Sequence, residues 1–354
     1  MKMQNDFTRK LLKWNKDQNK RIMPWKGEKD PYRIWLSEII LQQTRVEQGL
    51  AYYRKFILEF PDIMHLASSA EKEIFKCWEG LGYYSRCRNL IVTAKKIAFE
   101  SEGQFPSSYD ELLKLPGIGP YTAAAIASFA FGLPYVVVDG NVERVIARYF
   151  GINEPVGTTT GRKLFKGIAE TLLDRKKPAV FNQAIMDFGA TICKPQNPLC
   201  TICNQSQECF AFQKGLTRKL PLKKPAILRK KRWLYYFIVF EGRNNIWIHK
   251  RTENDIWQNL FEFALYETGK IIPQKNLQQS AFFKNLFGKQ GIRIEHISPA
   301  FNQTLTHQQI TCHFVHLDKP LAKLINFQSV PRKQLKEYPF PKIITDYLKI
   351  FNPQ

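Results

Sequence analysis

The residues whose spacing most restricts their chemistry are four cysteines, Cys193, Cys200, Cys203 and Cys209, in a C-x6-C-x2-C-x5-C arrangement. Four thiolates this close together can bind a zinc ion or an iron–sulfur cluster, and ligand chemistry alone permits both. The spacing is neither the two C-x2-C pairs of a zinc ribbon nor the C-x2-C-x2-C-x3-C run of small ferredoxins. Because three such gaps rarely arise by accident, the pattern predicts a shared metal centre rather than incidental or disulfide-bonded cysteines.

A second candidate for chemistry is Glu38, on a broadly apolar helix with Ile34, Trp35, Ile39 and Leu41 around it. Burial in such a setting raises the pKa of a carboxyl group, which can then stay protonated near neutral pH and donate that proton to a leaving group. The alternative is a solvent-exposed glutamate, which is common on helices.

Asp139 follows the apolar run 136–138 and precedes a helical pattern, so we expect it to cap the start of that helix. An ionised carboxylate at such a position can also stabilise positive charge that develops during a reaction. The two roles are compatible.

Residues 107–132, SSYDELLKLPGIGPYTAAAIASFAFG, predict two helices joined by a tight hairpin. Ser108 and Glu111 form a capping box, Gly117 and Gly119 lie in the hairpin, and Pro120 takes the first position of the second helix. Amides at the start of that helix can donate to a phosphate oxygen without recognising sequence. The pattern favours a DNA-binding helix-hairpin-helix motif, with an ordinary helix–turn–helix packing unit as the alternative.

The charge balance favours a nucleic-acid partner. The 354 residues include 53 Lys and Arg against 31 Asp and Glu, a net charge of +22. Such a field attracts phosphate polyanions, although it does not distinguish DNA from RNA or from an acidic membrane. Seven cysteines, an odd number, argue against a secreted disulfide scaffold. The first twenty residues lack an apolar core, so we expect no ordinary signal peptide.

Composition divides the chain into two domains. Helical spacing of apolar residues predicts an all-α domain over 1–213, and a basic, proline-containing segment at 214–232 is expected to be a linker, either along phosphate or simply solvated. Alternating patterns predict an α+β domain over 233–354, with a hairpin formed by 233–242 and 246–251, a helix at about 277–287, and strands at 292–297 and 309–317.

Taken together, these motifs resemble those of the MutY branch of the helix-hairpin-helix DNA glycosylases, which also includes endonuclease III. The matching segments cover most of the helical domain: PWKGEKDPYRIWLSEIILQQTRVEQ at 24–48, the helix-hairpin-helix at about 108–131, V-D-G-N-V-x-R-V at 138–145, and the cysteine loop 193–209. The resemblance implies a [4Fe–4S] cluster bound by Cys193, Cys200, Cys203 and Cys209.

The same resemblance implies catalytic roles. Glu38 would protonate a leaving adenine, Asp139 would stabilise the charge at the sugar C1′ electrostatically or through a covalent adduct, and Asn141 would help to hold Asp139 or the sugar. Tyr121 stands where bifunctional relatives have a lysine nucleophile, and a phenol cannot form a Schiff base. An adenine pocket is expected from Arg21, Met23, Trp25, Val46 and Gln183, with Lys26 where many relatives have arginine.

Base flipping needs a side chain to fill the gap in the duplex. The resemblance implies Gln43 and the loop Gly80–Arg86 for this purpose, with Tyr83 or Tyr84 stacking and with Arg86 and Arg88 contacting phosphates. Adjacent tyrosines are also ordinary packing residues.

The second domain resembles, more weakly, the nudix-like carboxy-terminal domain of MutY proteins. Their guanine-recognition loop usually has Phe-Ser-His where this chain has Leu305-Thr306-His307, so Thr306 and His307 are candidates to contact 8-oxoguanine, while a polar turn is the alternative. Residues 264–300 contain only Glu267 and Glu295 as acids, so metal-dependent nudix hydrolysis is not expected.

Three functions are compatible with these motifs: a monofunctional adenine glycosylase, a glycosylase/lyase for oxidised pyrimidines, and a non-catalytic damage binder. Tyr121 disfavours the second, and the paired Glu38 and Asp139 disfavour the third. The resemblance therefore implies a [4Fe–4S] enzyme that excises adenine opposite 8-oxoguanine or guanine from double-stranded DNA, acting as a monomer and, in a bacterium, in the cytoplasm with the nucleoid.

Overall fold

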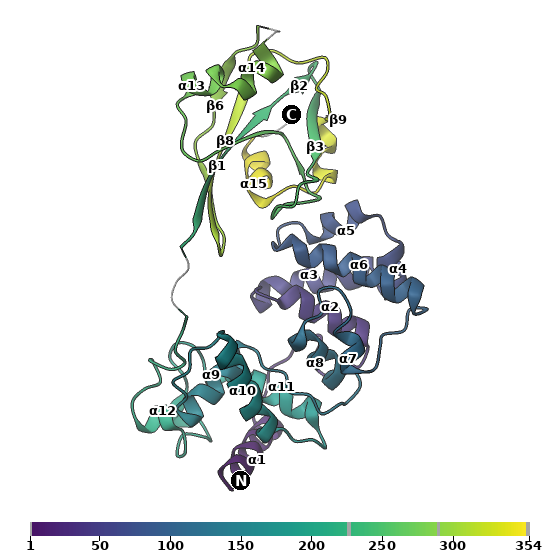
Figure 1. Cartoon of the computed structure of the whole chain (residues 1–354). Helices are drawn as coiled ribbons and strands as arrows, with labels where there is room; N and C mark the ends of the chain where they lie inside the picture. The colour runs from purple at the N-terminus through teal and green to yellow at the C-terminus, as the bar shows by residue number, and fades with distance from the viewer. Residues whose placement is uncertain (1, 225–227, 289–290, 352–354) are drawn as a thin grey trace. The chain divides into compact units, whose positions relative to one another are not determined.

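The computed structural model describes residues 2–224, 228–288 and 291–351. It divides into two compact units, the first comprising Met1–Ser68 with Asn89–Pro225 and the second comprising Ser69–Arg88 with Ala226–Gln354 (Figure 1). Residues 225–227 of the predicted linker lie outside the described residues. In the described part of the chain, no helix has the length and apolarity needed to cross a membrane.

The first unit is helical, as predicted. Its helices are α1 (Lys2–Asp17), α2 (Pro31–Leu41), α3 (Val46–Glu59), α4 (Ile63–Ser68), α7 (Tyr109–Leu112), α8 (Pro120–Phe129), α9 (Gly140–Phe150), α10 (Thr159–Leu172), α11 (Pro178–Thr191) and α12 (Phe210–Gln213). Helix α6 (Tyr84–Glu100) begins in the second unit and ends in the first. One core, which includes Phe7, Trp14, Phe165 and Phe188, joins α1, α9, α10 and α11, while α2 packs on α3 and α8.

The helix-hairpin-helix is confirmed. Ser108 caps α7 by accepting a hydrogen bond from the Glu111 amide, and Pro120 is the first residue of α8. Gly117 has φ +74°, and a Cβ there would lie 2.6 Å from the Cβ of Asn89, so both its conformation and the close approach require glycine. Gly119, at the start of α8, is exposed, and apart from its chain neighbours no described residue has an atom within 4 Å of a Cβ built there.

The second unit is α+β, as predicted. In the order β5 (Ala264–Thr268), β1 (Lys230–Ile238), β8 (Gln308–Leu317), β6 (Ile294–Ile297), the strands of one sheet lie side by side, and β7 (Phe301–Thr304) also pairs with β8. Strands β1 and β8 run parallel, whereas the other pairs in this sheet are antiparallel. A second sheet has the order β2 (Phe240–Glu241), β3 (Asn245–Lys250), β4 (Phe261–Glu262), with β9 (Gln328–Pro331) on β3.

Two predicted elements of this unit were wrong in detail. The run 233–242 is not one arm of a hairpin: β1 ends at Ile238 and pairs with β5 and β8, and only the short β2 pairs with β3. The predicted helix at 277–287 is two helices, α13 (Gln274–Gln279) and α14 (Ala281–Phe287), because Ser280 ends the first and caps the second. Helix α15 (Lys342–Ile350) was not predicted. Helix α5 (Glu71–Trp78) and the 3-10 helix η3 (Arg332–Glu337) also belong to this unit.

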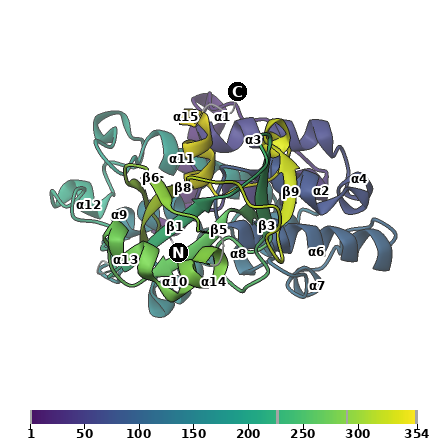
Figure 2. The ribbon, with the colours of Figure 1, turned by 90° about the horizontal axis from the view of Figure 1, so that it is seen from above.

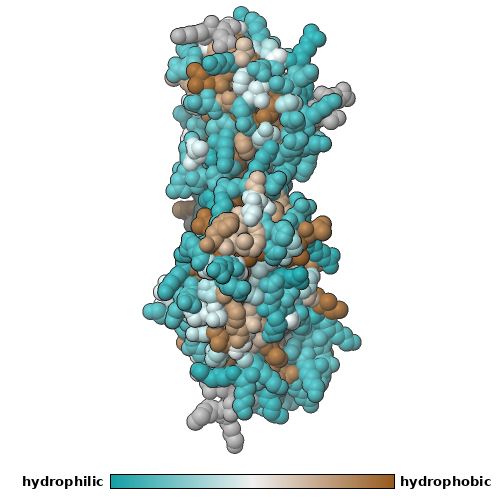
Figure 3. Space-filling view, turned by 90° about the vertical axis from the view of Figure 1, so that its right-hand side faces the viewer, coloured by the Kyte–Doolittle hydropathy of each residue, from teal (hydrophilic) through white to brown (hydrophobic). Residues whose placement is uncertain are grey.

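Figure 2 shows the strands and the helices α13, α14 and α15 of the second unit from above. The face drawn in Figure 3 is largely hydrophilic, with hydrophobic residues scattered among the polar ones.

Candidate active site

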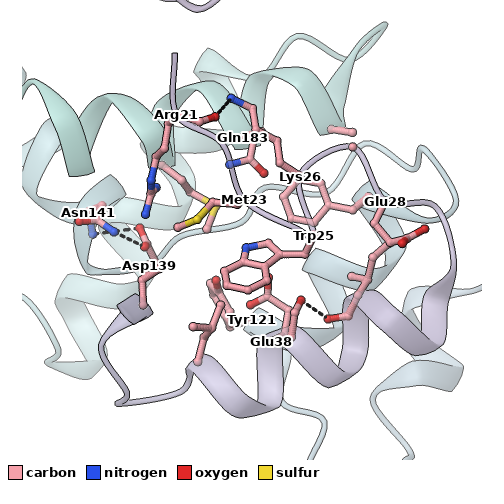
Figure 4. Close-up of a pocket in the computed structure, with 18 of the residues that line it drawn as sticks. Arg21, Met23, Trp25, Lys26, Glu28, Glu38, Tyr121, Asp139, Asn141 and Gln183 are labelled. Atoms are coloured by element: carbon pink, nitrogen blue, oxygen red, sulfur yellow. Dashed lines mark hydrogen bonds between the residues drawn. The ribbon is translucent and has the colours of Figure 1, made fainter. Parts of the chain in front are cut away.

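A cavity of about 660 Å³ lies within the first unit (Figure 4). Its walls come from the irregular segment between α1 and α2, from α2 itself, and from α8, α9 and α11. The cavity brings together all the residues predicted for catalysis and for the base pocket: Arg21, Met23, Trp25, Glu38, Val46, Tyr121, Asp139, Asn141 and Gln183. Gln43 and Lys26 also line it.

Glu38 is buried at this cavity, as the sequence predicted. Asp30 caps α2 by accepting from the Tyr32 amide, Pro31 starts the helix, and most of the helix is buried, so Glu38 is only 8% exposed. Burial raises the pKa of Glu38, a hydrogen bond with Tyr121 lowers it, and the nearby charge of Asp139 raises it, so that the net pKa is about 7. A substantial fraction of Glu38 is therefore protonated at neutral pH.

Tyr121, the second residue of α8, lies beside Glu38 in this cavity. Burial and the neighbouring charges of Glu38 and Asp139 raise the pKa of Tyr121 well above its ordinary value of 10. The phenol thus keeps its proton at neutral pH and can donate it in a hydrogen bond to the Glu38 carboxylate.

Asp139 caps α9, as predicted. Its Oδ1 accepts from the amides of Asn141 (2.9 Å) and Val142 (2.8 Å), and its Oδ2 accepts from Asn141 Nδ2 (2.6 Å). Burial raises the pKa of Asp139 from 3.8, while these hydrogen bonds favour the charged form and oppose the rise. The carboxylate is consequently held in one orientation before any substrate arrives.

Arg144 links Asp139 and Asn141 to more distant parts of the first unit. Its guanidinium donates to Asn141 Oδ1 (2.8 Å), to the Gly189 carbonyl (2.7 Å) and to the Cys193 carbonyl (2.8 Å). A Cβ at Gly189 would lie 2.7 Å from the Cβ of Asn141, so α11 can approach α9 this closely only with glycine there. The start of α9 is thereby held in place by the hydrogen bonds of Arg144 and by close contact with α11.

One buried residue of this region was missed by sequence reasoning. Asp187 lies on α11, one turn after Gln183, and is 0% exposed. Its carboxylate forms ion pairs with Arg21 and Lys26, two residues of the cavity wall. The only sequence signal was an acid on the apolar side of a helix, since its partners are more than 150 positions away.

The four cysteines line one small cavity of about 30 Å³ between the core and the loop 193–209. All four are free thiols, and Arg148, which is 2% exposed, places a guanidinium nitrogen 3.4 Å from Cys193 Sγ and 2.6 Å from the Lys194 carbonyl. In the described residues, no group of three or more His, Cys, Asp or Glu is arranged around a single-ion position. Four thiols at one cavity beside a buried cation fit an anionic cluster with thiolate ligands.

The candidate wedge residues differ in exposure. Gln43, at the cavity, and Tyr83, in the second unit, both have left-handed backbones, with φ +56° and +49°. Tyr83 is 44% exposed, whereas Tyr84 is 3% exposed and its hydroxyl accepts from the Gly80 amide. This burial favours Tyr83 over Tyr84 as the side chain that can enter DNA.

Arg86 and Arg88 are oriented by contacts within the second unit. The Arg86 guanidinium lies over the Trp78 ring and donates to the Gly82 carbonyl, and burial lowers the pKa of Arg86 to about 10. Arg88 donates to the Gln258 carbonyl at 3.3 Å. Both side chains are partly exposed. Their contact with phosphate stays a prediction.

Leu305, Thr306 and His307 form the turn between β7 and β8 in the second unit. Leu305 is half-buried, and its amide donates to the Gln308 carbonyl, while Thr306 and His307 are exposed. The hydroxyls of Thr306 and Tyr83, both in the second unit, lie 2.7 Å apart. Two residues predicted to contact DNA are therefore neighbours.

Known proteins share these features. Residues 36–170 match the family described as HhH-GPD superfamily base excision DNA repair protein, and residues 235–349 match the NUDIX domain family. An adenine DNA glycosylase of Buchnera aphidicola subsp. Schizaphis graminum is 36% identical over 357 residues, covering 98% of each chain. A solved thermostable thymine-DNA glycosylase matches 60% of this chain and 98% of its own, with 33% identity and a TM-score of 0.55. An endonuclease III–DNA complex matches 61% of this chain and 98% of its own, with a TM-score of 0.53 and 21% identity, a likeness of fold.

Proposed function

Because this chain belongs to the adenine DNA glycosylases of the HhH-GPD superfamily, we propose that it excises adenine paired with 8-oxoguanine or guanine in duplex DNA. It is a DNA N-glycosylase of base excision repair. The observation that supports our assignment of residues is the buried Glu38, whose pKa is about 7, in the same cavity as the capped carboxylate of Asp139.

In the proposed reaction, an adenine flipped from the duplex enters the cavity beside Trp25 and Met23. Glu38 donates its proton to a ring nitrogen of adenine, so the base leaves as a neutral molecule when the bond between C1′ and N9 breaks. Positive charge develops on the sugar, and the Asp139 carboxylate, held by the amides of α9, stabilises it. Water then forms the new bond to C1′, and its proton passes to a carboxylate.

The cavity offers no ready amine for strand cleavage among the described residues. Tyr121 takes the position of the lysine in bifunctional relatives. Two lysines line the cavity: Lys26 Nζ is paired with Asp187 at 2.9 Å, and Lys29 Nζ donates to the Phe129 carbonyl at 2.9 Å. A Schiff base needs an unprotonated amine that reaches C1′. We therefore propose a monofunctional enzyme, in which Tyr121 serves as a hydrogen-bond partner of Glu38.

We assign recognition of the DNA to exposed groups. The open amides beside Gly119 suit a phosphate, and Gln43 and Tyr83 suit the gap left by the flipped base. Thr306, whose hydroxyl is 2.7 Å from that of Tyr83, and His307 are proposed to contact 8-oxoguanine. The domain limits that we propose remain 1–213, 214–232 and 233–354.

Cys193, Cys200, Cys203 and Cys209 would hold the [4Fe–4S] cluster, which when bound supplies four bonds that fix the loop 193–209. The residues of the chain around it would then present Lys194 to the DNA backbone. None of the reaction steps above uses the cluster.

The proposal is tested by single-turnover excision on three duplexes, with adenine opposite 8-oxoguanine, guanine and thymine. We expect the fastest release from the 8-oxoguanine pair, slower release from the guanine pair, and none from the thymine pair. Borohydride treatment during the reaction should trap little covalent complex, since the cavity lacks the nucleophilic lysine. Equal rates on all three duplexes, or release of oxidised pyrimidines instead, would contradict the proposal.

A further inference from the structure

We infer that Asp187, which lies behind the base pocket, is a positioning residue that determines which group Gln183 presents to the base. This inference rests on the proposed function, since it concerns how the pocket recognises adenine. Asp187 is 0% exposed and is not among the residues that line the cavity, so it acts only through its neighbours.

The Asp187 carboxylate is surrounded by donors. Oδ1 accepts from Arg21 (2.8 Å) and from Gln183 Nε2 (3.0 Å), and Oδ2 accepts from Asn19 (2.9 Å) and pairs with Lys26 Nζ (2.9 Å). An ionised carboxylate has about four acceptor positions, so these donors account for all of them. A buried charge with this many partners has little freedom to move.

The consequence for Gln183 follows from the chemistry of its partner. A carboxylate only accepts hydrogen bonds, so the amide group that faces Asp187 has to be the NH2 and not the carbonyl. The orientation of this amide is thus fixed by a charge and not by crowding. Its carbonyl oxygen is left for the cavity that Gln183 lines.

A fixed acceptor at this position suits adenine among the purines. The 6-amino group of adenine is a donor, whereas guanine carries a 6-oxo acceptor, which would meet the Gln183 oxygen with repulsion. Asp187 also holds Arg21 and Lys26, at the two ends of the wall segment that includes Met23 and Trp25. One buried carboxylate therefore sets both the shape of this wall and the polarity of one of its groups.

The test compares two leaving bases opposite 8-oxoguanine: adenine, and unsubstituted purine, which lacks the 6-amino group. The measured quantity is the ratio of their single-turnover rates in the wild-type protein, in Asp187→Asn, in Gln183→Ala and in the double variant. An asparagine can itself donate to the Gln183 carbonyl, so the amide is no longer fixed. We expect the adenine-to-purine ratio to fall roughly fivefold in each single variant, the value of about one hydrogen bond. The double variant should fall no further.

A purely structural role would slow both bases equally and leave the ratio unchanged, which would overturn the inference. The same holds if Gln183→Ala keeps the wild-type ratio. Melting curves and binding to an uncleavable duplex report whether the variants fold. If Asp187→Asn does not fold, Asp187→Glu, which keeps the charge, should retain the wild-type ratio, and Gln183→Ala still tests the amide. A wild-type protein that released neither base would instead refute the proposed function.

Discussion

The cavity of the first unit and the β7–β8 turn of the second unit contrast in how they hold their polar groups. In the cavity, Glu38 is 8% exposed and Asp139 accepts three hydrogen bonds from the start of α9. At the turn, Thr306 and His307 are exposed, and the Thr306 hydroxyl lies 2.7 Å from the Tyr83 hydroxyl. Chemistry at neutral pH requires a desolvated acid, whereas contact with a DNA base requires an accessible donor. Changes to Glu38 or Asp139 should therefore remove most of the reaction rate, and changes at the turn should only reduce discrimination.

The sharpest test of this contrast is Glu38→Gln. The amide keeps the shape of the side chain but cannot supply a proton, so excision of adenine should slow on the order of a hundredfold or more. Binding to an uncleavable duplex should stay nearly unchanged, because Glu38 is buried. Single-turnover rates and a binding titration measure the two quantities. Release of adenine at close to the parental rate would show that Glu38 is not the acid.

The dependence of the excision rate on pH should reflect the pKa values of Glu38 and Asp139. Since the pKa of Glu38 is raised to about 7, the acid form is lost above that pH, and the single-turnover rate should fall about tenfold per unit. Toward low pH the rate should fall again as Asp139, whose pKa is raised from 3.8, becomes protonated. Tyr121→Phe removes the hydrogen bond that lowers the pKa of Glu38, so the alkaline limb should move to higher pH. An alkaline limb that does not move would remove Tyr121 from this role.

A third change separates binding from chemistry within the first unit. Cys203→Ser should lower the iron content and weaken duplex binding about tenfold or more. The substitution removes one bond between the cluster and the loop that presents Lys194, so the loop is held less firmly and its charged contacts to phosphate weaken. The rate per bound complex should change less than the affinity. Cys312→Ser, at a buried cysteine of the second unit, is the control and should keep its iron. Stoichiometric zinc without iron in the parent would refute the cluster.

The smallest effect is expected at the turn. Thr306→Ala and His307→Ala should each reduce the preference for 8-oxoguanine over guanine about fivefold, since a hydrogen bond is worth about 1 kcal/mol. The rate of adenine excision opposite guanine should stay at the parental value. Thr304→Ala, at an exposed threonine of the neighbouring strand β7, is the matched control. If the preference is unaltered in the double variant, the second unit does not recognise the damaged base through this turn.

Sequence patterns were most informative where neighbours along the chain determine the structure. The capping residues Asp139 and Ser108, the hairpin before Pro120 and the burial of Glu38 depend on residues within one or two helical turns, and all were predicted. The resemblance of segments 24–48 and 138–145 then identified residues that meet in the cavity.

The sequence was less informative where distant residues decide. Asp187 was not predicted because its partners Arg21 and Lys26 come from the other end of the domain, and the spacing of residues does not indicate such distant ion pairs. Strand β1 was assigned to a hairpin because its parallel partner β8 lies far along the chain. Likewise, no pattern indicated that Ser69–Arg88 belongs to the compact unit of the carboxy-terminal sheets.

The capping of α9 by Asp139 also bears on how quickly the protein can inspect DNA. A protein that slides along a duplex stays only briefly at each base pair, so a catalytic group that had to rotate into place would often miss its opportunity. The amides of Asn141 and Val142 already hold the Asp139 carboxylate, and no rotation is left to be made when a base arrives. If Asp139 acts as proposed, the start of a helix, present from the moment of folding, would shorten the time that each encounter needs.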